Sequence, residues 1–290
     1  MRTRVTALLG VLLLVAACAP SGFAAPAPFT PGATAHTITV GGVDRSYRLY
    51  LPAGLPPAAP LVVMLHGGFG SAAQAERTYG WNDLADSAKF VVAYPDGLGR
   101  AWNAGTAGPP TSDSAGNCCG RSSRDDVDDV GFITAAVRDI AGNIAIDPSR
   151  IYATGISNGG MMAYKLACNT AVFAAIGPDS ATQLDSCPAP SPTSVVHIHG
   201  TADPVVRYGG QPGQGFARID GPAVPEVNAF WRGIDRCAPP VMTVDGALTT
   251  SAADCPDRRS VELITVAGGG HEWPAFATQM IWDFFAAHPR

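Results

Sequence analysis

A serine enclosed by glycines is the first group in this sequence that could perform chemistry. Ser157 lies in the stretch Gly155-Ile156-Ser157-Asn158-Gly159, directly after the apolar run IYAT and directly before the helix-like run GGMMAYKLAC. A tight strand-to-helix turn exposes a serine hydroxyl only when the flanking positions carry almost no side chain. Ser157 is therefore a candidate nucleophile, and the alternative is an accidental turn of small residues.

A serine hydroxyl is a weak nucleophile, so it needs a base, and the base needs an orienting acid. Where a strand-to-helix turn carries the serine, the acid and then the histidine follow it along the chain. Asp203 comes just after the strand-like run SVVHIHG, and His271 lies in a glycine-rich loop after the run VELITVA. We predict a catalytic triad of Ser157, Asp203 and His271, with Asp179 as the alternative acid.

The tetrahedral intermediate of such a reaction needs hydrogen-bond donors for its oxyanion. One donor is expected to be the backbone N–H of Asn158, the residue after the nucleophile. The second should come from the loop that reads HGGFG at residues 66–70, through the amide of Phe69 or of Gly68. Only backbone groups are required there, which explains the glycines.

The sequence indicates the functions of other side chains near the predicted strand ends less specifically. Trp102, Trp273 and Tyr208 could line a substrate pocket, although aromatic residues in such loops also serve as ordinary packing. His197 and His199 point to one face of a predicted strand, but the third ligand that a metal would need is missing. We therefore predict no metal site and expect His199 to hold the loop of the acid.

The elements that must position these residues alternate along the chain. Short apolar runs that end in Gly, Asp or Ser are typical of buried parallel strands; they are PLVVMLHG, FVVAYPDG, RIYATGIS, FAAIGPDS and SVVHIHG. HTITVGG and RSYRLYLP predict an opening hairpin with its turn near Gly41-Gly42. A helical repeat of apolar residues follows the acidic cluster that begins at Asp125. The prediction is one α/β domain with a mostly parallel sheet, helices on both faces and no large cap domain, since 178–193 is too short for one.

The N-terminus predicts export. Residues 1–17 combine a basic start with an apolar stretch, as a signal peptide does, and VAAC resembles a lipobox that would make Cys18 a lipidated N-terminus. Cleavage near Ala24 to give a secreted protein is the alternative. Residues 18–35 are rich in Pro and Ala and predict a flexible tether, which leaves 36–290 as the catalytic domain. The protein is then extracytoplasmic, held to the membrane by a lipid or secreted.

The charge and the cysteine content bear on the binding partner and on the cellular compartment. The net charge is −5, so the chain lacks a basic surface for a nucleic acid. Apart from Cys18 there are six cysteines, an even number that predicts disulfides in an oxidising compartment. Short loops favour two pairs, Cys168 with Cys187 and Cys237 with Cys255. The adjacent Cys118 and Cys119 then form either a vicinal bond or two free thiols.

Several motifs together resemble one family. HGGFG, YPDG, CCG followed by DDVGFI, GISNGGMMAY, HIHGTAD and GGGHEWP are similar to the extracellular polyhydroxybutyrate depolymerases and feruloyl or acetylxylan esterases, including lipoprotein esterases of the LpqC type. The resemblance covers about residues 37 to 287. It implies an α/β-hydrolase fold, no cofactor, and Ser157, Asp203 and His271 as the residues that match the family triad.

The expected activity is hydrolysis of carboxylic esters through an acyl-enzyme. HGGFG stands where many feruloyl esterases have HGC, and the chain lacks the separate domain with which depolymerases bind solid polyester, so a soluble small ester or an esterified polysaccharide or oligomer is favoured. Two alternatives remain, an acyltransferase of the same fold and a non-catalytic glycan-binding lipoprotein. We expect a monomer; the acyl and alcohol groups of the substrate are not indicated.

Overall fold

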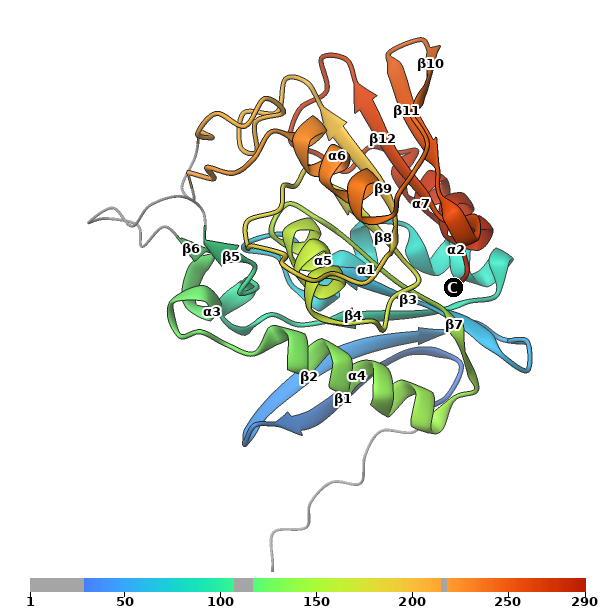
Figure 1. The fold of residues 1–290 in the computed structure, drawn as a ribbon. Coiled ribbons are helices and arrows are strands. Elements are labelled where there is room, and N and C mark those ends of the chain that lie inside the picture. The colour runs from blue at the N-terminus through green and yellow to red at the C-terminus, as the bar shows by residue number, and fades with distance from the viewer. Residues whose placement is uncertain (1–28, 107–116, 215–217) are drawn as a thin grey trace, which may run out of the picture.

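A single ten-stranded sheet runs through the molecule (Figure 1). The computed structural model describes residues 29–106, 117–214 and 218–290, and for residues 106, 117 and 118 only the backbone. The strand order is β1-β2-β4-β3-β7-β8-β9-β12-β11-β10. A second sheet of two short strands, β5 (Gly105–Thr106) and β6 (Asn117–Cys118), lies beside it.

Six neighbouring strands in the middle of the large sheet are parallel. They are β4 (Val91–Pro95), β3 (Ala59–Leu65), β7 (Ile146–Ile156), β8 (Ala175–Asp179), β9 (Ser194–Gly200) and β12 (Ser260–Val266). Five of them correspond to the five apolar runs of the sequence, and β12 corresponds to VELITVA. β3, β4, β8 and β9 are buried at every position, as expected for parallel strands that helices cover on both faces.

Antiparallel hairpins extend the sheet at both edges. β1 (Gly32–Val40) and β2 (Val43–Leu51) form the predicted opening hairpin. Its two-residue turn is Gly41-Gly42, with φ of 59° and 80°, which glycine adopts without steric cost. At the other edge, β10 (Val241–Asp245) and β11 (Leu248–Asp254) form a hairpin that the sequence analysis did not predict.

Helices cover both faces of the sheet. One face carries α4 (Asp129–Asn143), α5 (Asn158–Asn169) and α6 (Val224–Ile234), which lie in front of the strands in Figure 1. The opposite face carries α1 (Ala72–Thr78), α2 (Trp81–Ala88) and α7 (Ala277–Ala287). A short helix α3 (Gly120–Arg124) and two 3₁₀ turns, η1 (Leu98–Arg100) and η2 (Pro256–Arg258), complete the described elements.

Each face of the sheet has its own apolar core. Phe132, Met161 and Trp231, one from each helix of the first face, belong to a cluster with Val63 and Leu49. Trp81 and Phe285 belong to the cluster on the opposite face. The sheet is thus sandwiched between two helical layers, which is the predicted architecture.

The first described residues fall inside the predicted tether. β1 begins at Gly32, so residues 32–35 belong to the sheet rather than to the predicted tether. The predicted leader and Cys18 lie outside the described residues. Residues 180–193, between β8 and β9, contain no helix, in agreement with the expected lack of a cap. No helix in the described ranges is both long enough and apolar enough to cross a membrane.

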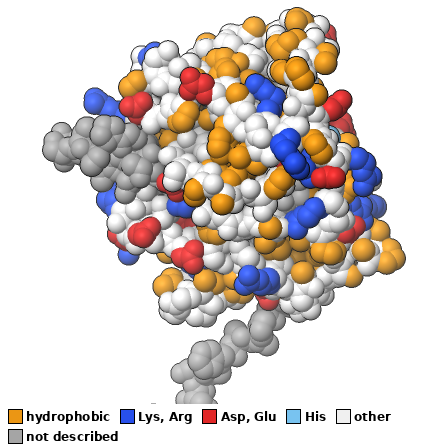
Figure 2. All heavy atoms as spheres, viewed as in Figure 1, with side chains coloured by type: hydrophobic (Ala, Val, Ile, Leu, Met, Phe, Trp, Pro, Cys, Tyr) orange, Lys and Arg blue, Asp and Glu red, His pale blue; other side chains and the backbone are white. Residues whose placement is uncertain are grey.

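Figure 2 shows a surface on which charged and apolar side chains alternate, with apolar side chains gathered over the protruding β10–β11 hairpin at the upper right. The exposed apolar residues of β10 are Val241, Met242 and Val244. This strand is the edge of the sheet and is exposed along its whole length.

Candidate active site

Ser157 lies at the turn between β7 and α5. Its backbone has φ 55° and ψ −121°, a conformation that non-glycine residues rarely adopt and that costs energy. Every neighbour from Ile151 to Gly160 is buried, whereas Ser157 is half-buried. A strained backbone and a half-buried serine between buried neighbours are typical of a nucleophile at a strand-to-helix turn, and this role for Ser157 stays a prediction.

The glycines around Ser157 are required by close backbone contacts. A Cβ at Gly159 would lie 2.2 Å from the carbonyl oxygen of Leu65, and one at Gly155 would lie 2.6 Å from the same atom. No side chain fits at such distances, so α5 can approach the end of β3 only with glycine at both positions. The physical reason inferred from the sequence is confirmed.

Asp203 and His271, 68 positions apart in the chain, are hydrogen-bonded in the structure. His271 Nδ1 lies 2.8 Å from Asp203 Oδ2. The carboxylate is buried and the imidazole is 20% exposed, so the pair has one end in the protein and one end open to solvent. This is the arrangement expected of a general base held by an acid.

The loop after β12 carries His271 across the ends of the neighbouring strands. Gly269 accepts a hydrogen bond from the Ala202 amide (2.9 Å), and a Cβ on Gly200 would lie only 2.2 Å from the Gly269 oxygen. Farther along, the Ser180 hydroxyl donates to the carbonyl of Glu272 at 3.3 Å. The loop thus passes over β9 and reaches β8, the strand next to the one that ends at Ser157.

Asp203 is held as a carboxylate by its surroundings. Burial alone would raise its pKa, but the neighbouring His199 and His271 side chains and the Val206 amide outweigh burial and keep the pKa well below its usual range. Oδ1 accepts from the amides of Val205 (2.7 Å) and Val206 (2.9 Å). The Asp203 side chain is therefore both ionised and fixed in orientation at neutral pH.

Asp179, the alternative acid, lies in a different environment. It ends β8, and its carbonyl accepts the amide of Ser157 at 2.9 Å. Its side chain is fully buried, and neither carboxyl oxygen has a hydrogen-bond partner among the described residues. Burial, the largest influence, raises its pKa well above the usual range; the neighbouring Ser180 side chain opposes this only in part, and the charges of Asp203 and Glu272 add to it. His271 is bonded to Asp203 rather than to Asp179.

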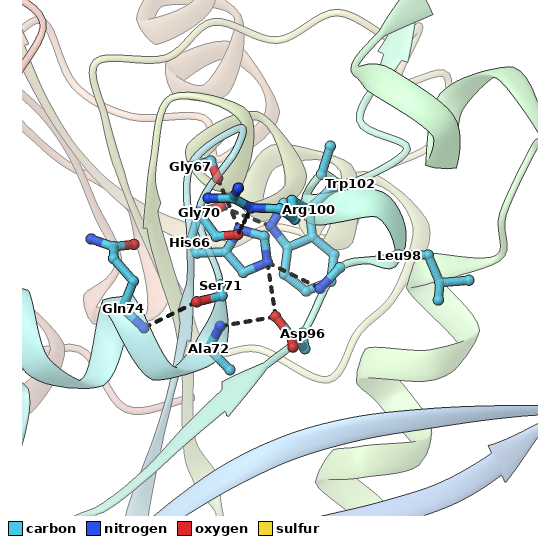
Figure 3. Close-up of polar contacts among 12 residues, drawn as sticks. His66, Gly67, Gly70, Ser71, Ala72, Gln74, Asp96, Leu98, Arg100 and Trp102 are labelled. Carbon is cyan, nitrogen blue, oxygen red and sulfur yellow. Dashed lines mark hydrogen bonds and ion pairs between the residues drawn. The ribbon is translucent and has the colours of Figure 1, made fainter.

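The loop HGGFG is anchored through His66 (Figure 3). His66 Nε2 accepts from the Gly97 amide at 3.0 Å, and Nδ1 donates to the Gly67 carbonyl at 2.8 Å. Burial, the largest influence, lowers the pKa of this fully buried ring, which fits its use as a neutral donor and acceptor. Arg100 binds the carbonyls of Phe69 and Gly70 from the other side.

The Phe69 amide has a different partner from the one expected. It donates to the carbonyl of Arg100 at 2.8 Å, and Phe69 itself has φ 63° and is 65% exposed. The tight turn that places Arg100 over the loop therefore occupies this amide. Of the two amides considered for the oxyanion, Gly68 is the one we retain.

Trp102 links the HGGFG loop to the helix after Ser157, a connection that the sequence analysis missed. Its indole Nε1 donates to the His66 carbonyl at 2.8 Å. Its backbone amide donates to Asn158 Oδ1 at 2.7 Å, and Asn158 Nδ2 donates back to the Trp102 carbonyl at 3.1 Å. Because Trp102 is fully buried, it connects the two predicted sources of oxyanion donors instead of presenting its ring to a ligand.

The other two aromatic candidates are partly buried and hydrogen-bonded. Trp273 Nε1 donates to Thr278 Oγ1 at 2.9 Å, and its ring packs against Tyr79 with centroids 5.0 Å apart. The Tyr208 hydroxyl lies 3.0 Å from Thr265 Oγ1. Both contacts are typical of packing, and a pocket role for Trp273 or Tyr208 stays a prediction.

The predicted disulfides Cys168–Cys187 and Cys237–Cys255 are both present. The first joins the last turn of α5 to the loop after β8, so it fixes the helix that begins next to Ser157. Cys119 is also disulfide-bonded, which removes the possibility that it is a free thiol. The Cys118 side chain lies outside the described atoms. Within the described ranges, no three His, Cys, Asp or Glu side chains are grouped as metal ligands.

Comparison with known proteins finds relatives that are named as esterases. The model of the family "Esterase PHB depolymerase" matches residues 45–209, more than half of the chain. The chain is 34% identical over 317 aligned residues to NocK of Nocardia uniformis subsp. tsuyamanensis, a protein named as an esterase, covering 92% of this chain and 88% of that protein. It is 31% identical to feruloyl esterase B of Piromyces equi, over 78% of this chain but only 42% of that longer enzyme.

Among solved structures, an acetyl xylan esterase from Aspergillus awamori superposes with a TM-score of 0.65. The alignment covers 88% of this chain and 99% of that enzyme at 16% sequence identity, a likeness that concerns the fold. Together with the sheet order and the two helical layers, it identifies the architecture as an α/β-hydrolase. By the extent of the family match and of the similarity to NocK, the chain belongs to the esterase PHB depolymerase family.

Proposed function

We propose that this protein is an extracytoplasmic serine esterase in which Ser157, His271 and Asp203 form the catalytic triad. The observation that carries the proposal is the 2.8 Å bond between His271 and Asp203, in loops that reach the strand next to the turn of Ser157. The half-buried Ser157, with the strained backbone expected of a nucleophile at such a turn, supports the same assignment.

In the proposed reaction, Ser157 Oγ attacks the carbonyl carbon of the ester while His271 Nε2 takes the hydroxyl proton. The Asp203 carboxylate accepts the Nδ1–H of His271, which selects the tautomer with a vacant Nε2 and stabilises the imidazolium that forms. The imidazolium then protonates the departing alcohol, and an acyl-serine remains. Water, deprotonated by His271, attacks the acyl-serine, and the acid is released with Ser157 restored.

The oxyanion of each tetrahedral intermediate would be bound by the backbone amides of Asn158 and Gly68. Asn158 is the first residue of α5, so its amide points out of the helix N-terminus, where the dipole favours negative charge. The Trp102 contacts hold this amide at a fixed position relative to the HGGFG loop. Rigid donors that need no rearrangement are the ones that stabilise a transition state most effectively.

The substrates we propose are soluble esters of short-chain, hydroxyalkanoyl, acetyl or feruloyl acids. Relatives in the comparison are named feruloyl esterase, acetylxylan esterase and poly(3-hydroxyalkanoate) depolymerase, which all cleave carboxylic esters. Export is supported by the predicted leader and by the disulfides, which persist in oxidising compartments. Mass spectrometry of the mature N-terminus distinguishes a lipid on Cys18 from free secretion.

The decisive experiment compares hydrolysis of p-nitrophenyl acetate and butyrate by the wild type and by Ser157→Ala. The variant should lose about 10⁴-fold or more in kcat, since the nucleophile acts only in the reaction path. Equal rates in the two proteins would exclude the catalytic assignment. Labelling by a fluorophosphonate probe at Ser157 provides a second readout, and a panel that includes methyl ferulate ranks the acyl groups.

A further inference from the structure

A buried chain of side chains connects Asp203 to the helix that follows Ser157. The Tyr164 hydroxyl lies 2.8 Å from His197 Nδ1, and His197 Nε2 lies 3.0 Å from His199 Nδ1. His199 Nε2 lies 2.7 Å from the Val206 carbonyl and 3.4 Å from Asp203 Oδ2. Tyr164, His197 and His199 are all 0% exposed.

The secondary structure explains why these three residues meet. His197 and His199 alternate along β9, so both rings point to the same face of the sheet, which α5 covers. Tyr164 is seven residues after Ser157 and therefore lies on the same side of α5, two turns along. The chain consequently joins the element that carries the nucleophile to the loop that carries the acid.

The hydrogen positions follow from the partners of each atom. The Val206 carbonyl can only accept, so His199 Nε2 carries a proton. If His199 is neutral, its Nδ1 accepts from His197 Nε2, and His197 Nδ1 accepts from the Tyr164 hydroxyl. The reverse direction would leave the Tyr164 proton without an acceptor among the described residues, at complete burial, which is costly.

Electrostatics favour the same arrangement. Burial, and secondarily the neighbouring His199, hold the pKa of His197 well below its usual range, so this ring stays neutral. Every donor in the chain then points from Tyr164 toward the loop that contains Asp203 and Val206, and hydrogen bonds aligned in one direction polarise one another. The last donor, His199 Nε2–H, is bonded to the Val206 carbonyl and lies 3.4 Å from the same carboxylate oxygen that holds His271.

We infer that Tyr164, His197 and His199 are positioning residues: their hydrogen-bond chain ends at the Val206 carbonyl and fixes the His199 Nε2–H 3.4 Å from Asp203, which holds the triad acid ionised and oriented toward His271. The inference rests on the proposed function, because it assigns a role to residues behind the proposed triad. It predicts that the chain affects the chemical step, not substrate binding, and that its effect depends on a donor at the His199 Nε2 position.

The first test uses matched variants of His199. His199→Gln retains an amide donor near the Nε2 position, whereas His199→Asn is too short to reach the Val206 carbonyl. With p-nitrophenyl butyrate, His199→Asn should lower kcat about tenfold with KM within about twofold, and His199→Gln should stay within about threefold of wild type, because only the Asn variant loses the donor to the Val206 carbonyl. Equal losses in the two variants would overturn the inference.

The far end of the chain provides the second test. Tyr164→Phe should lower kcat about threefold and have no further effect in the His199→Asn background, since the chain is already interrupted there. Tyr47→Phe is the control. It removes the hydroxyl of another buried tyrosine, which donates to Asp139 and takes no part in the Tyr164–His197–His199 hydrogen bonds, so kcat should stay unchanged. Equal kcat losses in Tyr164→Phe and Tyr47→Phe would show a general packing effect and contradict the inference.

A third readout needs no catalysis. ¹⁵N NMR of histidine-labelled protein at neutral pH should show His197 and His199 as neutral Nε2–H tautomers. The chemical shift of His197 Nδ1 should change in Tyr164→Phe, which removes its hydrogen-bond donor. An imidazolium or an Nδ1–H tautomer at either ring would overturn the chain. Failure of the wild type to hydrolyse esters in a Ser157-dependent manner would refute the proposed esterase instead, and the tautomers would still decide whether the chain has this direction.

Discussion

At the scale of single residues, two buried aspartates at the ends of neighbouring strands, Asp179 at the end of β8 and Asp203 after β9, illustrate how surroundings decide a role. Asp203 has donors to both carboxyl oxygens and is held as an anion. Asp179 has no such partner within the described residues, and its raised pKa favours the neutral acid. Only the anion can stabilise an imidazolium, so the environment and not the residue type selects Asp203 as the proposed acid.

Asp179→Asn should stabilise the protein increasingly as the pH rises. A carboxyl whose pKa is raised by folding destabilises the folded state progressively once the pH exceeds the unfolded value of about 3.9, at about 1.4 kcal/mol per pH unit until the folded pKa is reached. Asparagine does not ionise, so the difference in unfolding free energy should be small near about pH 4 and exceed about 1 kcal/mol near about pH 8. Urea unfolding at both pH values measures it.

The control for this prediction is the same substitution at Asp283, which is exposed on α7. It should give a difference in unfolding free energy that hardly changes between the two pH values. A constant or decreasing advantage of Asp179→Asn with rising pH would contradict a neutral Asp179 in the folded protein.

At the scale of elements, the site depends on how closely α5 approaches β3. Trp102 hydrogen-bonds both to Asn158, at the start of α5, and to His66, just after β3. The strained turn of Ser157 immediately precedes α5. Because the Gly159 position touches the carbonyls of Leu65 and His66, a larger residue would displace the HGGFG loop together with the helix. Stability and oxyanion geometry should therefore be lost together.

Gly159→Ala should destabilise the protein by about 2–4 kcal/mol and greatly reduce kcat. The added Cβ would lie 2.2 Å from the Leu65 oxygen, which forces backbone to move. Chemical denaturation and p-nitrophenyl acetate hydrolysis check the two effects.

Gly142→Ala, in α4, is the matched control for the elbow variant. Nothing lies within 4 Å of a Cβ at this position, so alanine should raise stability by up to about 1 kcal/mol and leave activity unchanged. Wild-type stability in Gly159→Ala would show that the elbow tolerates a side chain and would refute the packing argument.

At the scale of the whole molecule, a buried ion pair ties the first hairpin to the body. Arg45, in β2, lies 2.6 Å from Asp129 at the start of α4, and the arginine is also 3.9 Å above the Phe132 ring. Asp129 accepts in addition the amide of Asn103, in the segment that leads on from Trp102. One carboxylate thus joins the sheet edge, a covering helix and the loop behind the site.

Arg45→Met should destabilise the fold by about 3–5 kcal/mol, because Asp129 would be left buried without its cation. Burial already raises the pKa of Asp129, and loss of the arginine removes one of the contacts that oppose this. Thermal or urea unfolding measures the loss.

The surface pair Arg121–Asp125 gives the comparison for this prediction. Arg121 is 73% exposed, so Arg121→Met should change stability by less than about 0.5 kcal/mol. Similar losses for the two arginine variants would mean that burial does not control the strength of these pairs.

The sequence predicted most of the sheet and the turn of Ser157. The parallel strands are short apolar runs, and the turn depends on glycines next to a serine, so both are local signals. The β10–β11 hairpin was missed although its two-residue turn, Gly246-Ala247, begins with a glycine, which has a positive φ of 56°. The strand β11, with the sequence LTTSAAD, is rich in Thr, Ser and Ala, so the second half of the hairpin carries no alternating apolar pattern.

The chain by itself determined which residue types are available, their order and the fold class, because strand periodicity and glycine positions act over a few residues. Tertiary structure alone decided which atoms meet. The bond of His271 to Asp203 rather than Asp179, the turning of the Phe69 amide to Arg100, and the chain from Tyr164 to Asp203 all join residues from different strands or loops. Hydrogen bonds depend on tenths of an ångström and on angles, which only the packed sheet and its covering helices define.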